Sequence, residues 1–92
     1  MSPRWIVPAH IGWRDVDADL VLFDEQSMQY HALNGVGSAI WRACARGAPR
    51  PDIVANLAAT YDAPSESIAE QVDAFLEELV GAGLLLRDPG GA

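Results

Sequence analysis

Lysine is absent from this sequence of 92 residues, and cysteine occurs once. With Cys44 alone no internal disulfide can form, and nothing argues for export to an oxidising compartment. No apolar run approaches the ~20 residues needed to span a bilayer. The N-terminal residues, interrupted by Pro3 and Pro8, do not resemble a signal peptide. We therefore expect a cytoplasmic protein that does not contact a membrane.

Motifs of the common enzyme classes are also missing. The sequence has no Gly-rich phosphate loop, paired-cysteine metal spacing, zinc-protease helix motif or nucleophile elbow. His10 and His31 are isolated, and Cys44 falls on the apolar face of an expected helix, where a thiol behaves as an inert hydrophobe. We predict that the protein is not an enzyme and binds neither a metal nor a cofactor.

The formal net charge is −7, from thirteen acidic and six basic residues. An acidic surface repels phosphate, so a nucleic-acid partner is not expected. The same charge favours basic peptides or proteins as partners through long-range attraction. A charge of this size would also simply keep a small domain in solution, and both interpretations can hold.

The pattern of apolar residues predicts an α+β domain. Three short strands are expected at 11–15, 20–23 and 28–33, joined by turns short enough for an antiparallel sheet. Three helices should follow, opened by Asn34, Pro51 and Pro64; Gly47 ends the first, and Gly81 and Gly83 end the third. Residues 84–86 can add a short extended piece. The result is a winged-helix-like fold with its three-stranded antiparallel sheet placed before the three helices.

One domain is expected, at residues 11–87, between an N-terminal arm (1–10) and a flexible tail (88–92). Prolines disfavour regular hydrogen bonding in the arm. Trp5 lies in this arm and could either pack back on the domain or contact a partner. We favour packing, because an aromatic side chain left in water is costly.

A set of residues in a fixed order carries a family resemblance. These are Tyr30-His31-Ala32-Leu33-Asn34, Ile40-Trp41, Gly47, Tyr61-Asp62, Val72-Asp73, Phe75-Leu76, Leu79 and Gly83-Leu84. No single motif is specific, but the ordered set, from about Trp13 to Leu86, resembles the PqqD-like family. One departure is the turn Glu25-Gln26-Ser27, where many relatives have a glycine, so the turn type and the register of the third strand are left open.

The resemblance implies a recognition element for a ribosomally synthesised and post-translationally modified peptide (RiPP). Such a protein binds the leader segment of a precursor peptide and presents it to a peptide-modifying enzyme, in pathways of the PQQ, lasso or related kinds. The edge of a sheet has unpaired N–H and C=O groups, to which an extended peptide can add as a further strand. In the family the third strand supplies that edge and the third helix supplies the other wall.

Carried onto this chain, the resemblance places the peptide between residues 28–32 and the third helix. The candidate peptide-binding residues are Met28, Gln29, Tyr30, His31, Ala32, Val72, Asp73, Phe75, Leu76, Leu79 and Val80. Leu76 and Val80 extend the apolar stripe of the helix, and Asp73 borders it. This surface would suit a leader with aliphatic residues and one basic residue. Alternatively, Leu76 and Val80 pack under the sheet.

Two other functions remain open. The protein could be a non-catalytic assembly or regulatory subunit that binds a folded protein partner. It could also be a DNA-binding winged helix, but the third helix contains neither Arg nor Lys, which is the wrong charge for phosphate.

Overall fold

The computed structural model describes residues 4–17 and 19–88. The elements follow in the order β1 (Arg4–Ile6), β2 (Ile11–Val16), β3 (Asp19–Asp24), β4 (Gln29–Leu33), α1 (Gly35–Ala45), α2 (Arg50–Tyr61), α3 (Ser65–Gly81) and β5 (Leu86–Asp88). Strands β2, β3 and β4 form an antiparallel sheet in that order, and β1 pairs with β5 in a second, two-stranded sheet. The predicted α+β order of three antiparallel strands followed by three helices is confirmed.

The alternation of buried and more exposed side chains along β3 shows which face of the larger sheet is covered. Leu20 and Leu22 are fully buried, whereas Val21 and Phe23 lie on the outer face, as the two-residue period of a strand requires. Leu22 stands between Trp13 on β2 and His31 on β4, so these three positions share the covered face. The sheet therefore contributes one face to the core.

The turn between β3 and β4 is stabilised without glycine. The Asp24 carboxylate accepts a hydrogen bond from the Gln26 backbone N–H at 2.9 Å, and Met28 adopts a left-handed backbone with φ of 60°. Met28 thus occupies a backbone conformation that glycine adopts at lower cost. The prediction that Met28 belongs to the third strand is wrong, because the strand begins at Gln29.

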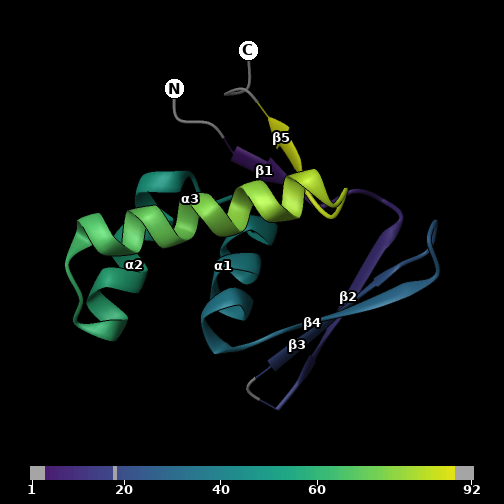
Figure 1. Ribbon diagram of the computed structural model, residues 1–92, viewed down its shortest axis with the longest axis horizontal. Coiled ribbons are helices and arrows are strands. Elements are labelled where there is room, and N and C mark those ends of the chain that lie inside the picture. The colour runs from purple at the N-terminus through teal and green to yellow at the C-terminus, as the bar shows by residue number, and fades with distance from the viewer. Residues whose placement is uncertain (1–3, 18, 89–92) are drawn as a thin grey trace.

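The helices begin and end largely at the expected residues. The Asn34 side chain accepts a hydrogen bond from the Gly37 backbone N–H at 3.1 Å and caps α1. Gly47, with φ of 80°, follows the end of α1. The buried face of α3 consists of Ile68, Val72, Leu76 and Leu79. In Figure 1, α3 crosses over α1 and α2, while the three-stranded sheet extends to one side.

The small sheet joins the two ends of the described chain. Trp5 on β1 is opposite Arg87 on β5, and the Trp5 side chain is only 5% exposed. The favoured prediction that Trp5 packs on the domain is confirmed. The expectation of an irregular arm over residues 1–10 is wrong at residues 4–6, which form β1, whereas residues 7–10 belong to no helix or strand. The start of the predicted arm (1–3) and most of the tail (89–92) lie outside the described residues.

Within residues 4–17 and 19–88, no helix is long and apolar enough to cross a membrane.

Candidate functional site

Strand β4 is an edge strand. It pairs with β3 on one side, and no other described strand pairs with its opposite side. An open strand edge offers backbone N–H and C=O groups to another extended segment. The side chains of Gln29, Tyr30 and Ala32 are exposed, whereas that of Leu33 is buried. The middle of β4 is thus accessible, and its C-terminal end is anchored in the core.

A cavity of about 480 Å³ lies between β4 and the C-terminal half of α3. It is lined by His31, Ala32, Leu33, Phe75, Glu78, Leu79, Ala82 and Leu84. Most of these side chains are apolar, and Glu78 supplies the one carboxylate. A largely apolar hollow with a few polar groups is the usual composition of a binding site.

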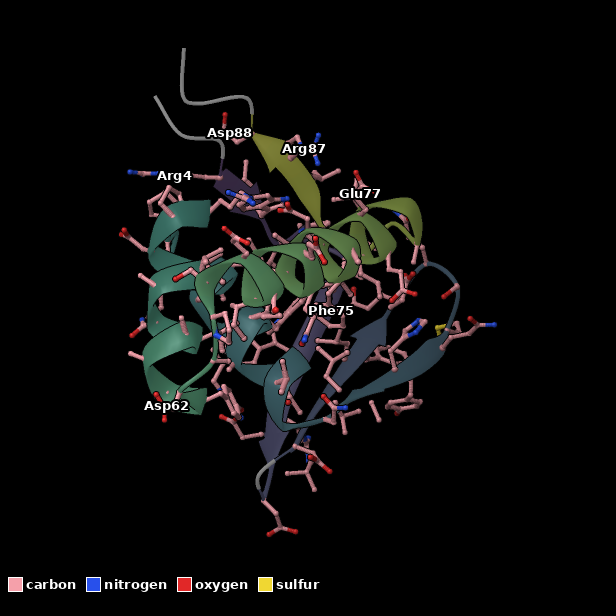
Figure 2. All side chains as sticks on the ribbon, turned by 60° about the vertical axis from the view of Figure 1, so that its left-hand side comes forward. Arg4, Asp62, Phe75, Glu77, Arg87 and Asp88 are labelled. Atoms are coloured by element: carbon pink, nitrogen blue, oxygen red, sulfur yellow. The ribbon has the colours of Figure 1, made fainter. Side chains whose placement is uncertain are left out.

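A second cavity, of about 320 Å³, lies between α1 and α3. Its lining residues are Asn34, Val36, Gly37, Ile40, Gln71 and Phe75. Phe75 lines both cavities, so they form two compartments of one groove with this side chain between them. Figure 2 shows Phe75 on the side of α3 that faces the sheet. We refer below to the strand compartment, beside β4, and the helix compartment, beside α1.

The structure brings together four of the predicted site residues. His31 and Ala32 on β4 face Phe75 and Leu79 on α3 across the strand compartment. Gln29 lies at the start of the same strand edge.

Two other predicted residues on or near β4 do not line the groove. Tyr30 is 73% exposed and contacts Phe23 on the outer face of the sheet, with the ring centroids 4.8 Å apart. Met28 is 70% exposed in the turn before the strand.

Four predicted residues on α3 lie away from the groove. Val72 and Leu76 belong to the core, and Leu76 is only 1% exposed. Val80 is partly buried against the core. The structure therefore corrects the expectation that Leu76 and Val80 form an exposed apolar wall: Leu76 is buried in the core, and Val80 is partly buried against it.

Asp73 points toward α2 instead of the groove. Its carboxylate accepts two hydrogen bonds from the Arg50 guanidinium, from Nε at 2.6 Å and from Nη2 at 2.8 Å. This hydrogen bonding holds the pKa of Asp73 below its ordinary value, and nearby Arg87 acts in the same direction. Asp73 thus links α2 to α3 and does not border the groove.

The groove face of α3 includes residues that the sequence analysis missed. These are Gln71, Glu78 and Ala82, the last just after the end of α3; with the predicted Phe75 they are spaced by four, three and four residues, which places them on one side of the helix. Asp73 and Val80 lie on the other side of the buried stripe, because each residue turns the helix by about 100°. The spacing was present in the sequence, but its mixed polarity hid it from a search for apolar residues.

The chemistry of the remaining candidates is limited. Burial raises the pKa of the Cys44 thiol to about 12, so at neutral pH it is protonated and a poor nucleophile. His10 lies 3.9 Å from the Asp24 carboxylate and away from the groove. In the part of the chain that the structure describes, no three His, Cys, Asp or Glu side chains are close enough to hold a metal ion.

The fold and the groove together define a winged-helix-like domain with an accessible edge strand. Residues 19–85 match the sequence profile of the PqqD family, described as coenzyme PQQ synthesis protein D. The chain therefore belongs to the PqqD family. A comparison with curated proteins gave no match.

Two solved structures are similar over nearly their full length. One is TbiB1 in complex with the TbiA(beta) leader peptide, with a TM-score of 0.82, 26% identity and coverage of 94% of this chain and 95% of that one. The other is lasso peptide synthetase B1 complexed with the leader peptide, with a TM-score of 0.84, 22% identity and coverage of 90% and 98%. At 22% identity the similarity to the second structure supports the fold alone.

Proposed function

We propose that this protein binds the leader segment of a RiPP precursor by strand addition at β4 and presents the peptide to a modifying enzyme. The observation that carries the proposal is the open edge of β4 beside a largely apolar groove. Membership of the PqqD family and the likeness to TbiB1, solved with a leader peptide, support it.

The two sides of the groove have different tasks in this mechanism. Main-chain hydrogen bonds to β4 supply affinity that depends little on the peptide's sequence, and the groove selects side chains. Apolar side chains fit against Leu79 and Phe75, and a basic side chain can pair with Glu78. The net charge of −7 attracts a basic leader from a distance.

The protein's role in this proposal is recognition, and chemistry on the precursor belongs to a partner enzyme. The proposal places both in the cytoplasm, where ribosomes make the precursor. The pathway, whether of the PQQ, lasso or another kind, is set by the partner enzyme and the precursor.

Binding is tested with two sets of probes. The first consists of synthetic N-terminal segments of short reading frames beside the gene, and the second is a displayed library of random peptides. We expect at least one peptide to bind, with amide NMR shifts concentrated at Gln29–Leu33 and at residues 71–82, which run along α3 to its C-cap. Shifts centred on α2, or no binder from either set, would contradict the proposal.

Strand addition is tested on the peptide itself. In an added strand every second residue directs its backbone groups toward the neighbouring strand. Methylating one backbone nitrogen at a time should therefore abolish binding at alternate positions and leave the positions between them nearly unaffected. A helical peptide would not give a period of two.

The role of Glu78 is tested by a charge reversal with a matched control. Glu78→Arg should weaken binding of a basic peptide about tenfold, because it places a like charge in the groove. Glu77→Arg makes the same change at an exposed position on the side of α3 away from Phe75 (Figure 2) and should have a much smaller effect. Equal losses for both would assign the effect to net charge alone.

A further inference from the structure

Gly37 on α1 lies directly under the ring of Phe75. A Cβ atom built on Gly37 would lie 2.9 Å from Cζ and 3.3 Å from Cε1 of that ring. Real Cβ atoms do not approach so closely, so any side chain at this position would displace the ring. Gly35, two residues earlier in α1, has nothing within 4 Å of its own Cβ position.

The backbone does not require glycine at residue 37. Only Gly47 and Gly83 among the described glycines have a positive φ, so Gly37 has an ordinary helical backbone. Alanine would be the better helix former there. The space taken by the Phe75 ring is thus the physical reason for a residue without a side chain.

The position of this ring determines the shape of the groove. Phe75 lines both compartments, and it is only partly buried, so its ring can move outward if it is pushed off α1. An outward ring would occupy the space on either side of it. With the ring seated on Gly37, both the 480 Å³ strand compartment and the 320 Å³ helix compartment stay open.

The two compartments differ in the polar groups they offer. The strand compartment combines Leu33 and Leu79 with the carboxylate of Glu78. The helix compartment combines Val36 and Ile40 with neutral amides, including that of Gln71. Each can accept an apolar side chain, but only the strand compartment can pair with a cation.

We infer that Phe75 is the specificity-determining residue of the groove and that Gly37 is its positioning residue. A bound peptide straddles the ring, with one apolar side chain in each compartment and any basic residue on the strand side. Both apolar side chains must point to the same face of the extended peptide. Their positions in the peptide sequence therefore differ by an even number, as in residues i and i+2. This inference rests on the proposed function and specifies the peptide that the groove accepts.

The central experiment compares two alanine substitutions in one helix. The probe is the tightest peptide selected from the displayed library on the wild-type protein, and its affinity is measured by calorimetry. Gly37→Ala should weaken binding about tenfold, or about 1.4 kcal/mol, because the displaced ring fills the groove. Gly35→Ala should bind like wild type. Both variants should unfold cooperatively.

A second background separates the ring from other effects of Gly37→Ala. In Phe75→Leu the shorter side chain leaves room for a Cβ at residue 37. Gly37→Ala should then have no further effect on affinity, whatever Phe75→Leu costs by itself. Equal losses in both backgrounds would mean that Gly37 acts independently of Phe75, which would overturn the inference.

An NMR measurement without peptide gives an independent result. Wild type should show NOEs from the Phe75 ring protons to Gly37 Hα, and in Gly37→Ala the ring should instead show stronger NOEs to groove methyls such as those of Leu79. An unmoved ring would overturn the inference even if peptide binding is confirmed. Failure to obtain any binding peptide, with the ring moving as expected, would count against the proposed function alone.

Discussion

Neighbouring residues of α3 serve different surfaces, because successive positions of a helix are rotated by about 100°. Phe75 lines the groove, whereas Leu76 is buried in the core. Leu76→Asp should therefore reduce the free energy of unfolding by more than about 3 kcal/mol, since it buries an unpaired charge. Ala74→Asp, an exposed position on the same helix, is the control and should change stability by less than about 1 kcal/mol.

Chemical denaturation followed by circular dichroism measures both variants. A Leu76→Asp protein that unfolds near the wild-type midpoint would contradict the burial of this residue. Such a result would restore Leu76 as a possible exposed wall of the groove.

The buried thiol of Cys44 predicts a pH dependence of stability. Burial raises its pKa from 9.0 to about 12. Below pH 9 the thiol is protonated in both states, but above it only the unfolded chain loses the proton, so stability falls as pH rises. The expected loss is about 1.4 kcal/mol per pH unit between the two pKa values.

Cys44→Ala isolates this contribution. The variant should be less stable at pH 7, because a buried side chain becomes smaller. Its disadvantage relative to wild type should shrink between pH 9 and pH 11, measured by urea denaturation at several pH values. Parallel curves for the two proteins over this range would contradict a raised pKa.

At the scale of elements, β1 and β5 close the fold by joining its two ends. Trp5 carries the packing of β1 and lies in the core cluster. Trp5→Ala should reduce the free energy of unfolding by about 3 kcal/mol or more, because a large buried side chain is lost. Ile6→Ala, at a position that is 47% exposed on the same strand, should cost much less.

Equilibrium denaturation of these two variants and wild type gives the comparison. Similar small losses for both would mean that β1 is peripheral to stability. The predicted boundary at residue 10 would then be a better description of the domain.

At the scale of the whole molecule, the distribution of charge argues against nucleic acid. The α3 helix, which a DNA-binding winged helix would place in the major groove, carries five carboxylates and no basic residue. The chain as a whole has a net charge of −7. We predict no shift of duplex DNA in a gel assay at physiological salt. A sub-micromolar, salt-sensitive shift would contradict this and favour the rival winged-helix function.

The sequence by itself determined the kinds and order of the main elements. The short apolar run at 20–23 and the helical spacing of Val72 and Leu76 reflect local geometry, which a window of a few residues already shows. Asn34 and Gly47 act through hydrogen bonds and dihedrals within a few residues, so they too could be identified. For the same reason the edge strand at Gln29–Leu33 was predicted almost residue by residue.

Only the tertiary structure decided which side of α3 faces the groove and where the chain ends meet. An apolar stripe in the sequence indicates which side of a helix is buried. It does not indicate which of the two neighbouring sides lines the groove, because this depends on where β4 and α1 pack. The pairing of β1 with β5 joins segments about eighty residues apart, and strands of three residues carry too short a pattern to predict it. Gly37 is the clearest case. The reason for a glycine at this position is its contact with the Phe75 ring, and that contact forms only when α1 and α3 pack together.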